Sequence, residues 1–234
     1  MIAPDSFASA ASPQRPTHTD AGMTSERTRR RMIDRLRAQG VQDELVLTAM
    51  DAVPRHRFVE EALASRAYED TALPIGFGQT VSQPYIVASM IAALRSQRDA
   101  LGKTLEIGVG CGYQMAVLAQ LSEEVHGVER IAALCNKARS QLQALGMGHV
   151  EIHYGDGHAG HSPAAPFDSI IVAAATSLIP EALTRQLALG GRMILPLDEG
   201  AGQQILCIVN NTMQGLLVSR SEAVKFVPMK AGKA

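Results

Sequence analysis

Glycines placed between a strand pattern and a helix pattern give the first indication of chemistry. Gly108 lies near the end of the apolar stretch 105–109, and Gly110 and Gly112 follow that stretch and directly precede a helical pattern. Glycines in such a loop let the backbone pass close to a bound molecule, where a side chain would collide with it. The spacing G-x-G-x-G lacks the third glycine of the dinucleotide fingerprint, because Tyr113 stands there. The Gly-Lys-Ser/Thr of a phosphate-binding loop is missing as well.

Three carboxylates accompany this glycine loop. Glu106 precedes it, where a carboxylate would repel a pyrophosphate but could hold water or the ammonium of a cationic ligand. Glu129 ends the next strand pattern and can accept two hydrogen bonds from a ribose diol. Asp156, between Gly155 and Gly157, follows the third strand pattern and can accept from an exocyclic adenine amine. Together these groups predict a nucleoside ligand without phosphates, of which S-adenosylmethionine is the commonest example.

A second candidate site lies upstream, where the segment 72–83 runs into a helix that begins at Pro84. Ser82 or Gln83 stands at the predicted cap, so backbone N–H groups and the positive end of the helix dipole face whatever precedes them. This arrangement predicts an anion site. The alternative is that Ser82 only caps the helix, and the two roles are compatible.

Alternating strand and helix patterns must position these residues. The predicted strands cover residues 105–109, 125–129, 150–154, 169–175, 192–197, 204–209 and 215–220, and the predicted helices cover residues 113–121, 131–145 and 180–189. Such alternation predicts a mostly parallel α/β sheet with helices on both faces, and the connection 210–214 adds an antiparallel hairpin. The ligand should then lie at the carboxyl ends of the strands.

The first hundred residues precede this alternation. Residues 1–22 are rich in Ala, Ser, Pro and Thr without a continuous apolar run, so we expect a disordered tail and no secretory signal. A helix should begin at Ser25, and another should cover 84–95. We therefore predict one domain over residues 23–234, with a helical extension (23–100) before a cofactor-binding core (101–234).

Composition narrows the class of protein. The 234 residues are 46% hydrophobic and 19% charged, which fits one large globular domain. A net charge of −1 gives no indication of nucleic acid, and no apolar run is long enough to cross a membrane. Three cysteines without a CxxC pair argue against a disulfide scaffold and indicate a reduced, cytoplasmic setting.

The basic run 29–31 and a group of histidines each have a functional and a purely structural interpretation. The basic run 29–31 could contact nucleic acid or membrane, but without interleaved aromatic residues it is typical of the solvated face of an amphipathic helix. His153, His158 and His161 lie close together, yet their H-x4-H-x2-H spacing matches no common zinc pattern. We therefore expect loop histidines and no metal.

Several segments resemble the protein-L-isoaspartate O-methyltransferase family. The resemblance extends from about Glu26 to Lys230, and the Gly-Gln-Thr-Val-Ser-Gln-Pro stretch (78–84) is its most specific part, because other methyltransferases lack it. The remaining matching segments are 55–59, 72–88, 106–119, 155–157, 165–168, 179–180, 187–191 and 224–228. The resemblance implies a Rossmann-like fold that binds S-adenosyl-L-methionine, isoaspartyl proteins and peptides as partners, and a cytoplasmic monomer.

The same resemblance assigns roles to individual residues, with Ser82 as the active-site residue. The cofactor-binding positions that it implies are Gln79, Thr80, Val81, Ser82, Glu106, Gly108, Gly110, Gly112, Tyr113, Gln114, Glu129, Arg130, Gly155, Asp156 and Gly157. The substrate-binding positions are Ile75, Gly76, Gln83 and Pro84.

The sequence departs from the family pattern at a few of its positions. Val109 and Cys111 stand where the family commonly has hydroxyl residues, and His158 and His161 stand where it usually has tryptophans. The chain contains no Trp, and residues 173–176 read Ala-Ala-Ala-Thr in place of Thr-Ala-Ala-Pro. The changes at Val109 and Cys111 point to a changed affinity for the cofactor rather than to a different cofactor. Together the departures are compatible with an altered peptide preference or with a relative that has drifted from the parent activity.

The resemblance implies attack of an isoaspartyl α-carboxylate on the sulfonium methyl group. A carboxylate with a pKa of about 4 is ionised at neutral pH, so no general base is needed and Ser82 only orients the substrate. The methyl ester then closes to a succinimide. Two alternatives are a methyltransferase for another carboxylate or small molecule, and a non-catalytic cofactor-binding module whose basic helix recruits a partner. The Ser82 segment favours methylation of isoaspartyl residues over both alternatives.

Overall fold

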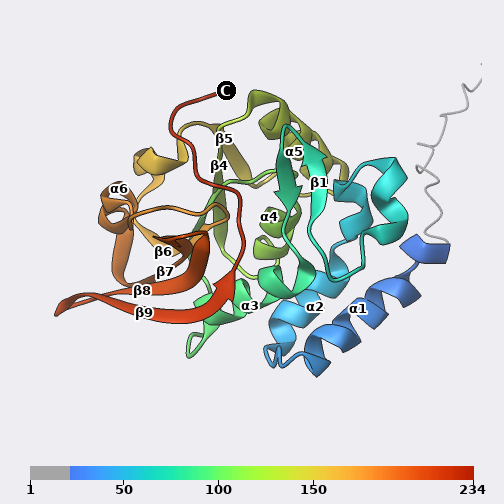
Figure 1. The fold of residues 1–234 in the computed structure, drawn as a ribbon, viewed down its shortest axis with the longest axis horizontal. Helices are drawn as coiled ribbons and strands as arrows, with labels where there is room; N and C mark the ends of the chain where they lie inside the picture. The colour runs from blue at the N-terminus through green and yellow to red at the C-terminus, as the bar shows by residue number, and fades with distance from the viewer. Residues whose placement is uncertain (1–21) are drawn as a thin grey trace, which may run out of the picture.

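A computed structural model describes residues 22–234, so the predicted tail falls outside the described residues except for Gly22. Among these residues the strands form a seven-stranded sheet in the order β5-β4-β3-β6-β7-β8-β9 and a separate two-stranded hairpin, β1-β2 (Figure 1). The strands are β1 (Leu73–Gly76), β2 (Gln79–Val81), β3 (Lys103–Ile107), β4 (Glu124–Glu129), β5 (Glu151–Tyr154), β6 (Phe167–Val172), β7 (Leu187–Gly200), β8 (Gln203–Thr212) and β9 (Gly215–Val224). The first five strands of the sheet are parallel and the last two antiparallel, as the sequence predicts.

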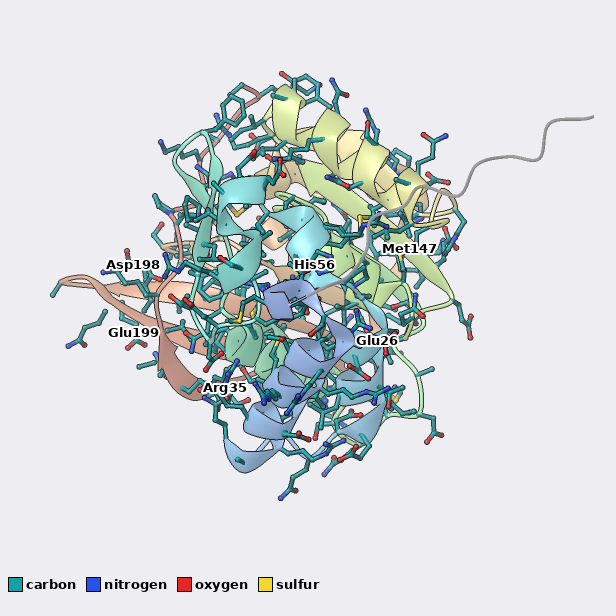
Figure 2. All side chains as sticks on the ribbon, turned by 90° about the vertical axis from the view of Figure 1, so that its right-hand side faces the viewer. Glu26, Arg35, His56, Met147, Asp198 and Glu199 are labelled. Carbon is teal, nitrogen blue, oxygen red and sulfur yellow. The ribbon has the colours of Figure 1, made fainter. Side chains whose placement is uncertain are left out.

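Helices cover the two faces of the sheet unequally. The helices are α1 (Glu26–Ala38), α2 (Glu44–Ala52), α3 (Pro84–Arg95), α4 (Tyr113–Leu118), α5 (Ala132–Ala144) and α6 (Glu181–Arg185). One face packs against α3, α4 and α5, with α1 and α2 outside them, whereas α6 and short 3-10 turns cover the other face. Figure 2 shows α1, marked by Glu26 and Arg35, across the front of the molecule and the β7–β8 hairpin, marked by Asp198 and Glu199, projecting to the side.

The strand predictions are confirmed with small shifts in their ends, but one helix prediction is wrong. The predicted helix 180–189 ends at Arg185, and Leu187 already belongs to β7, where it pairs with Phe167 of β6. The register then shifts, so that Arg192 pairs with Ser169 and the residues between bulge out of the ladder. Gly190 and Gly191 therefore lie within a strand instead of closing a helix.

The extension contains a hairpin that the sequence patterns did not indicate. β1 and β2 pair antiparallel across a turn at Phe77 and Gly78, whose φ angles of 55° and 68° are left-handed. This hairpin carries the segment 79–83 to the carboxyl ends of the parallel strands. The helix expected over 84–95 is α3, with the bounds that the sequence indicates, and α1 begins after the predicted N-cap Ser25.

One buried cluster runs through both parts of the chain. It contains Leu36 and Met50 of the extension together with Val117 and Leu134 of the core. The division at residue 100 stays a prediction. The cysteines are free and buried. Within residues 22–234, every helix is too short or too polar to reach across a bilayer.

Candidate active site

The glycine loop connects β3 to α4 at the point where the order of the sheet reverses. β3 lies between β4 and β6, so the chain continues to one side for two strands and then crosses to the other. Gly108, Gly110 and Gly112 have φ angles of 85°, 57° and 90°, which L side chains rarely adopt. The loop can therefore take this path only because these three positions lack a side chain. Its backbone faces the crevice in which open α/β sheets bind their ligands.

A pocket with an empty volume of about 860 Å³ opens beside this loop. Many of the predicted site residues line it: Ile75, Gln79, Thr80, Val81, Ser82, Glu106, Gly108, Gly110, Tyr113, Gln114, Glu129, Arg130 and Gly157. Six predicted residues are not in its lining: Gly76, Gln83, Pro84, Gly112, Gly155 and Asp156. Sequence reasoning did not single out Ala173, Ala174 or the segment 227–230 as lining residues. The segment 224–228 was noticed only as part of the family resemblance.

Glu129 fixes the glycine loop from the end of β4. Its Oε2 accepts a hydrogen bond from the Gly110 N–H and its Oε1 from the Ile131 N–H, both at 2.8 Å. The side chain is buried, and each oxygen keeps a further lone pair for a donor in the pocket. The geometry therefore supports the predicted contact with a ribose diol.

Glu106 lies on β3 with only 1% of its surface exposed. Its Oε1 accepts from Gln114 Nε2 at 3.0 Å, whereas Oε2 has no hydrogen-bond partner among the described residues. Burial raises the pKa of Glu106 well above its ordinary value; the Gln114 hydrogen bond opposes this shift and the charge of Glu129 adds to it. A buried carboxylate oxygen without a donor is costly. The ammonium group of an amino-acid moiety is the kind of donor that would satisfy it.

Ser82 is held by a buried arginine that sequence reasoning did not single out. Arg55 is fully buried; its Nη2 donates to the Ser82 carbonyl oxygen and its Nε to the Ala67 carbonyl oxygen, both at 2.8 Å. The guanidinium carbon lies 4.6 Å from the centre of the Tyr113 ring. Arg55 therefore ties the Ser82 backbone to a residue of α4. The signal available in the sequence was the segment 55–59, which contributed only to the resemblance.

The beginning of α3 is already partly occupied by a carboxylate of the protein itself. Gln83 is the N-cap residue, but its side chain does not cap the helix. Instead, Asp70 Oδ1 accepts from the Tyr85 N–H and Asp70 Oδ2 from Gln83 Nε2, both at 3.0 Å. Asp70 therefore uses the Tyr85 N–H, which is one hydrogen-bond donor of the predicted anion site. An anion beside Ser82 has to use other hydrogen-bond donors.

Asp156 has its carboxylate engaged by neighbouring chain segments. Oδ1 accepts from the His158 N–H at 2.9 Å, and Oδ2 accepts from the Gly232 N–H at 2.7 Å. Partial desolvation raises the pKa of Asp156, but these hydrogen bonds outweigh it and the net shift is downward. Arg130 Nε donates to the Gly232 carbonyl oxygen at 3.0 Å. The C-terminal segment, red in Figure 1, is therefore held at Gly232 beside Asp156, the residue predicted to receive the adenine amine.

A second pocket adjoins the first across the Ser82 segment. It has an empty volume of about 840 Å³ and shares Thr80, Ser82, Ala173 and Val227 with the first pocket. Its other lining residues are Ala72, Gln83, Ile86, Ala223, Val224, Lys225 and Phe226. Half-buried Ser82 therefore stands between two spaces. Of the predicted substrate residues, Gln83 lines the second pocket and Ile75 the first, whereas Gly76 and Pro84 line neither.

Comparisons with known proteins agree with this geometry. The family model described as protein-L-isoaspartate(D-aspartate) O-methyltransferase matches residues 27–234. The chain is 58% identical over 211 residues to the protein-L-isoaspartate O-methyltransferase of Dechloromonas aromatica, covering 90% of this chain and 97% of that protein. It is 52% identical over 223 residues to the protein of the same name from Chromobacterium violaceum, covering 95% and 99%.

The fold has close counterparts among solved structures. One is a Plasmodium falciparum protein-L-isoaspartate O-methyltransferase in complex with S-adenosyl-L-homocysteine, with a TM-score of 0.77 and 25% sequence identity. The match covers 86% of this chain and 98% of that chain.

Proposed function

The chain belongs to the protein-L-isoaspartate(D-aspartate) O-methyltransferase family, and we propose that it methylates the α-carboxylate of L-isoaspartyl residues in damaged proteins. S-adenosyl-L-methionine is the methyl donor. The observation that carries the proposal is the position of Ser82, which lines both the pocket beside the glycine loop and the adjoining pocket. A substrate carboxylate beside Ser82 would directly face the pocket beside the glycine loop. We call this pocket the donor pocket, because it would hold the methyl donor.

The donor pocket fits the cofactor through groups that the protein leaves ready. The unpartnered Oε2 of Glu106 suits an ammonium group, and Glu129 suits a ribose diol. The cofactor supplies a methyl group on a positively charged sulfur. Ser82 orients the substrate carboxylate by a hydrogen bond, and the side chains of Ile75, Val81 and Val87 exclude water. Because transfer neutralises two opposite charges, a dry site favours it.

The test is incubation of the full chain with labelled cofactor and two peptides that differ only in an isoaspartyl or an aspartyl residue. We expect label on the isoaspartyl peptide alone. Ser82→Ala should slow turnover with little change in S-adenosylhomocysteine affinity. Ser89→Ala is the control, because Ser89 lies within α3, after Ser82, and its hydroxyl donates to the Ile86 carbonyl oxygen; this change should leave both quantities unchanged. Equal labelling of the two peptides would favour a methyltransferase for another carboxylate, and no labelling a binding module.

We propose further that the partners are isoaspartyl proteins and peptides, that the enzyme acts in the cytoplasm as a monomer, and that residues 23–100 form its substrate-side extension. The three free, buried cysteines support a reducing compartment. The lining of the second pocket supports the extension, because Ala72, Ser82 and Gln83 come from it. Light scattering that gave the mass of two chains would contradict the monomer.

A further inference from the structure

Three histidines meet on the sheet face opposite α4, outside the lining of the donor pocket. His126 lies on β4 and His153 on β5, where their alternation in the paired strands places them on one face. His161 follows the turn after β5. His126 Nδ1 lies 3.2 Å from His153 Nε2, and the His153 and His161 rings stack with centroids 3.5 Å apart. One nitrogen of each residue lies within 4.8 Å of the other two.

Two carboxylates complete the surroundings of these rings. Glu124 Oε1 is 2.6 Å from His126 Nε2, and Glu124 Oε2 is 3.3 Å from Lys103 Nζ. A carboxylate at Nε2 holds the ring proton there, so the lone pair of Nδ1 points toward His153. Glu151 Oε2 lies 3.6 Å from His126 Nδ1 and 3.7 Å from His153 Nε2.

Three of the distances between possible ligand atoms are close to those between the ligands of one small metal ion. Two ligand atoms of a tetrahedral Zn²⁺ site, with bonds of about 2.0 Å, are about 3.3 Å apart. The three separations among His126 Nδ1, His153 Nε2 and Glu151 Oε2 are 3.2, 3.6 and 3.7 Å, so each needs only a small adjustment. The buried ring of His126 (3% exposed) is held from behind by Glu124, as ligating histidines commonly are.

We propose that His126, His153 and Glu151 bind a divalent transition-metal ion of the Zn²⁺ type, with His161 as the fourth ligand after its ring turns out of the stack with His153. Imidazole nitrogens select such ions over Mg²⁺ and Ca²⁺, which prefer oxygen ligands. The ion joins β4, β5 and the connection that follows Asp156, so it stabilises the edge of the sheet beside the donor pocket. Its role is structural.

The proposal replaces one residue of the sequence-based grouping and departs from the expectation of no metal. His158, which the spacing groups with His153 and His161, has its Nδ1 3.1 Å from Asp156 Oδ1. The third histidine is His126, which the pairing of β4 with β5 brings into place. The H-x4-H-x2-H spacing therefore omits one of the residues that meet.

The test is titration of the untagged, chelator-treated full chain with Zn²⁺ and, separately, Mg²⁺ by calorimetry. We expect one Zn²⁺ per chain, no comparable binding of Mg²⁺, and a higher melting temperature with Zn²⁺. Co²⁺ should give the visible absorption of a four-coordinate site. His161→Ala should weaken Zn²⁺ binding at least about tenfold, and Glu124→Gln about 10–100-fold.

His149→Ala is the matched control, because His149 is exposed and lies outside the cluster. It should leave Zn²⁺ affinity unchanged. His161 is on a half-exposed connection, so its replacement should leave the fold intact, which the circular dichroism spectrum checks. Binding that His161→Ala does not weaken, binding of less than one Zn²⁺ per chain, or equal binding of Mg²⁺ would overturn the proposal. None of these measurements depends on methyltransferase activity.

Discussion

The proposed binding group Glu106 opposes the stability of the ligand-free fold. Its carboxylate is buried with one oxygen unpartnered, and its pKa is raised well above the ordinary value. Between the unfolded and folded pKa values, the unfolded chain has released a proton that the folded chain keeps. Folding therefore becomes less favourable as pH rises through this window, by up to about 1.4 kcal/mol per pH unit.

Replacing this carboxylate should separate stability from affinity. We expect Glu106→Gln to unfold at higher urea concentration than the parent, with an advantage that grows from pH about 5 to about 7.5. The same change should weaken S-adenosylhomocysteine binding, because an amide pairs poorly with an ammonium group. Glu123→Gln, at an exposed glutamate, is the control and should change neither quantity. A stabilising effect that was the same at both pH values would contradict the burial argument.

Arg55 is expected to act as a positioning residue for Ser82. Arg55→Lys keeps the charge but cannot serve the Ser82 and Ala67 carbonyl oxygens with one planar fork. Leaving one buried carbonyl oxygen without its donor should lower the free energy of unfolding by about 2 kcal/mol. We also expect kcat to fall while the affinity for S-adenosylhomocysteine changes little. Urea unfolding and steady-state kinetics measure the two effects, and loss of stability with an unchanged kcat would reduce Arg55 to a packing role.

At the scale of elements, strands and helices were predictable where one segment decides its own structure. α3 follows from Pro84 and an apolar face, and the parallel strands follow from short apolar runs. The end of α6 was not predictable, because Leu187 becomes a strand residue through pairing with Phe167, far away in sequence. Two features of the sites were not predictable for the same reason, because they depend on contacts between distant segments. Arg55 reaches Ser82, and His126 reaches His153, only through tertiary contacts.

The packing of α4 on β4 explains one departure from the family loop. A Cβ atom on Gly127 would lie 2.4 Å from a methyl carbon of Val109 and 3.1 Å from the sulfur of Met115. Val109 thus fills the space that Gly127 leaves open. We expect Gly127→Ala to lower the free energy of unfolding by about 1–3 kcal/mol through overpacking, with partial recovery in the Val109→Ala double variant.

Gly148→Ala is the control for this packing prediction, because a Cβ atom there meets nothing within 4 Å. Chemical denaturation of the parent, the two single variants at positions 127 and 109 and the double variant measures the coupling between the two positions. Additive effects of the changes at positions 127 and 109 would contradict the assigned contact.

For the whole molecule, the site depends on parts that are distant in sequence. The extension supplies Ser82, the glycine loop supplies the backbone of the donor pocket, and the last residues supply part of its wall. An ion pair of 2.9 Å between Arg95 of α3 and Asp43 at the beginning of α2 ties the extension together. The family resemblance identified these parts as belonging to one site. The geometry adds which side chains hold them in place.

The contact of Gly232 with Asp156 and Arg130 has a kinetic consequence. The acid predicted to receive the adenine amine is bonded to the polypeptide's own N–H, and Val227 to Lys230 line the donor pocket. We therefore expect S-adenosylhomocysteine to leave the pocket only as fast as these residues move away from it. Gly232→Pro, which removes that N–H and cannot adopt its φ of 73°, should accelerate S-adenosylhomocysteine dissociation in stopped-flow measurements. An unchanged dissociation rate would show that the contact of Gly232 with Asp156 does not control product release.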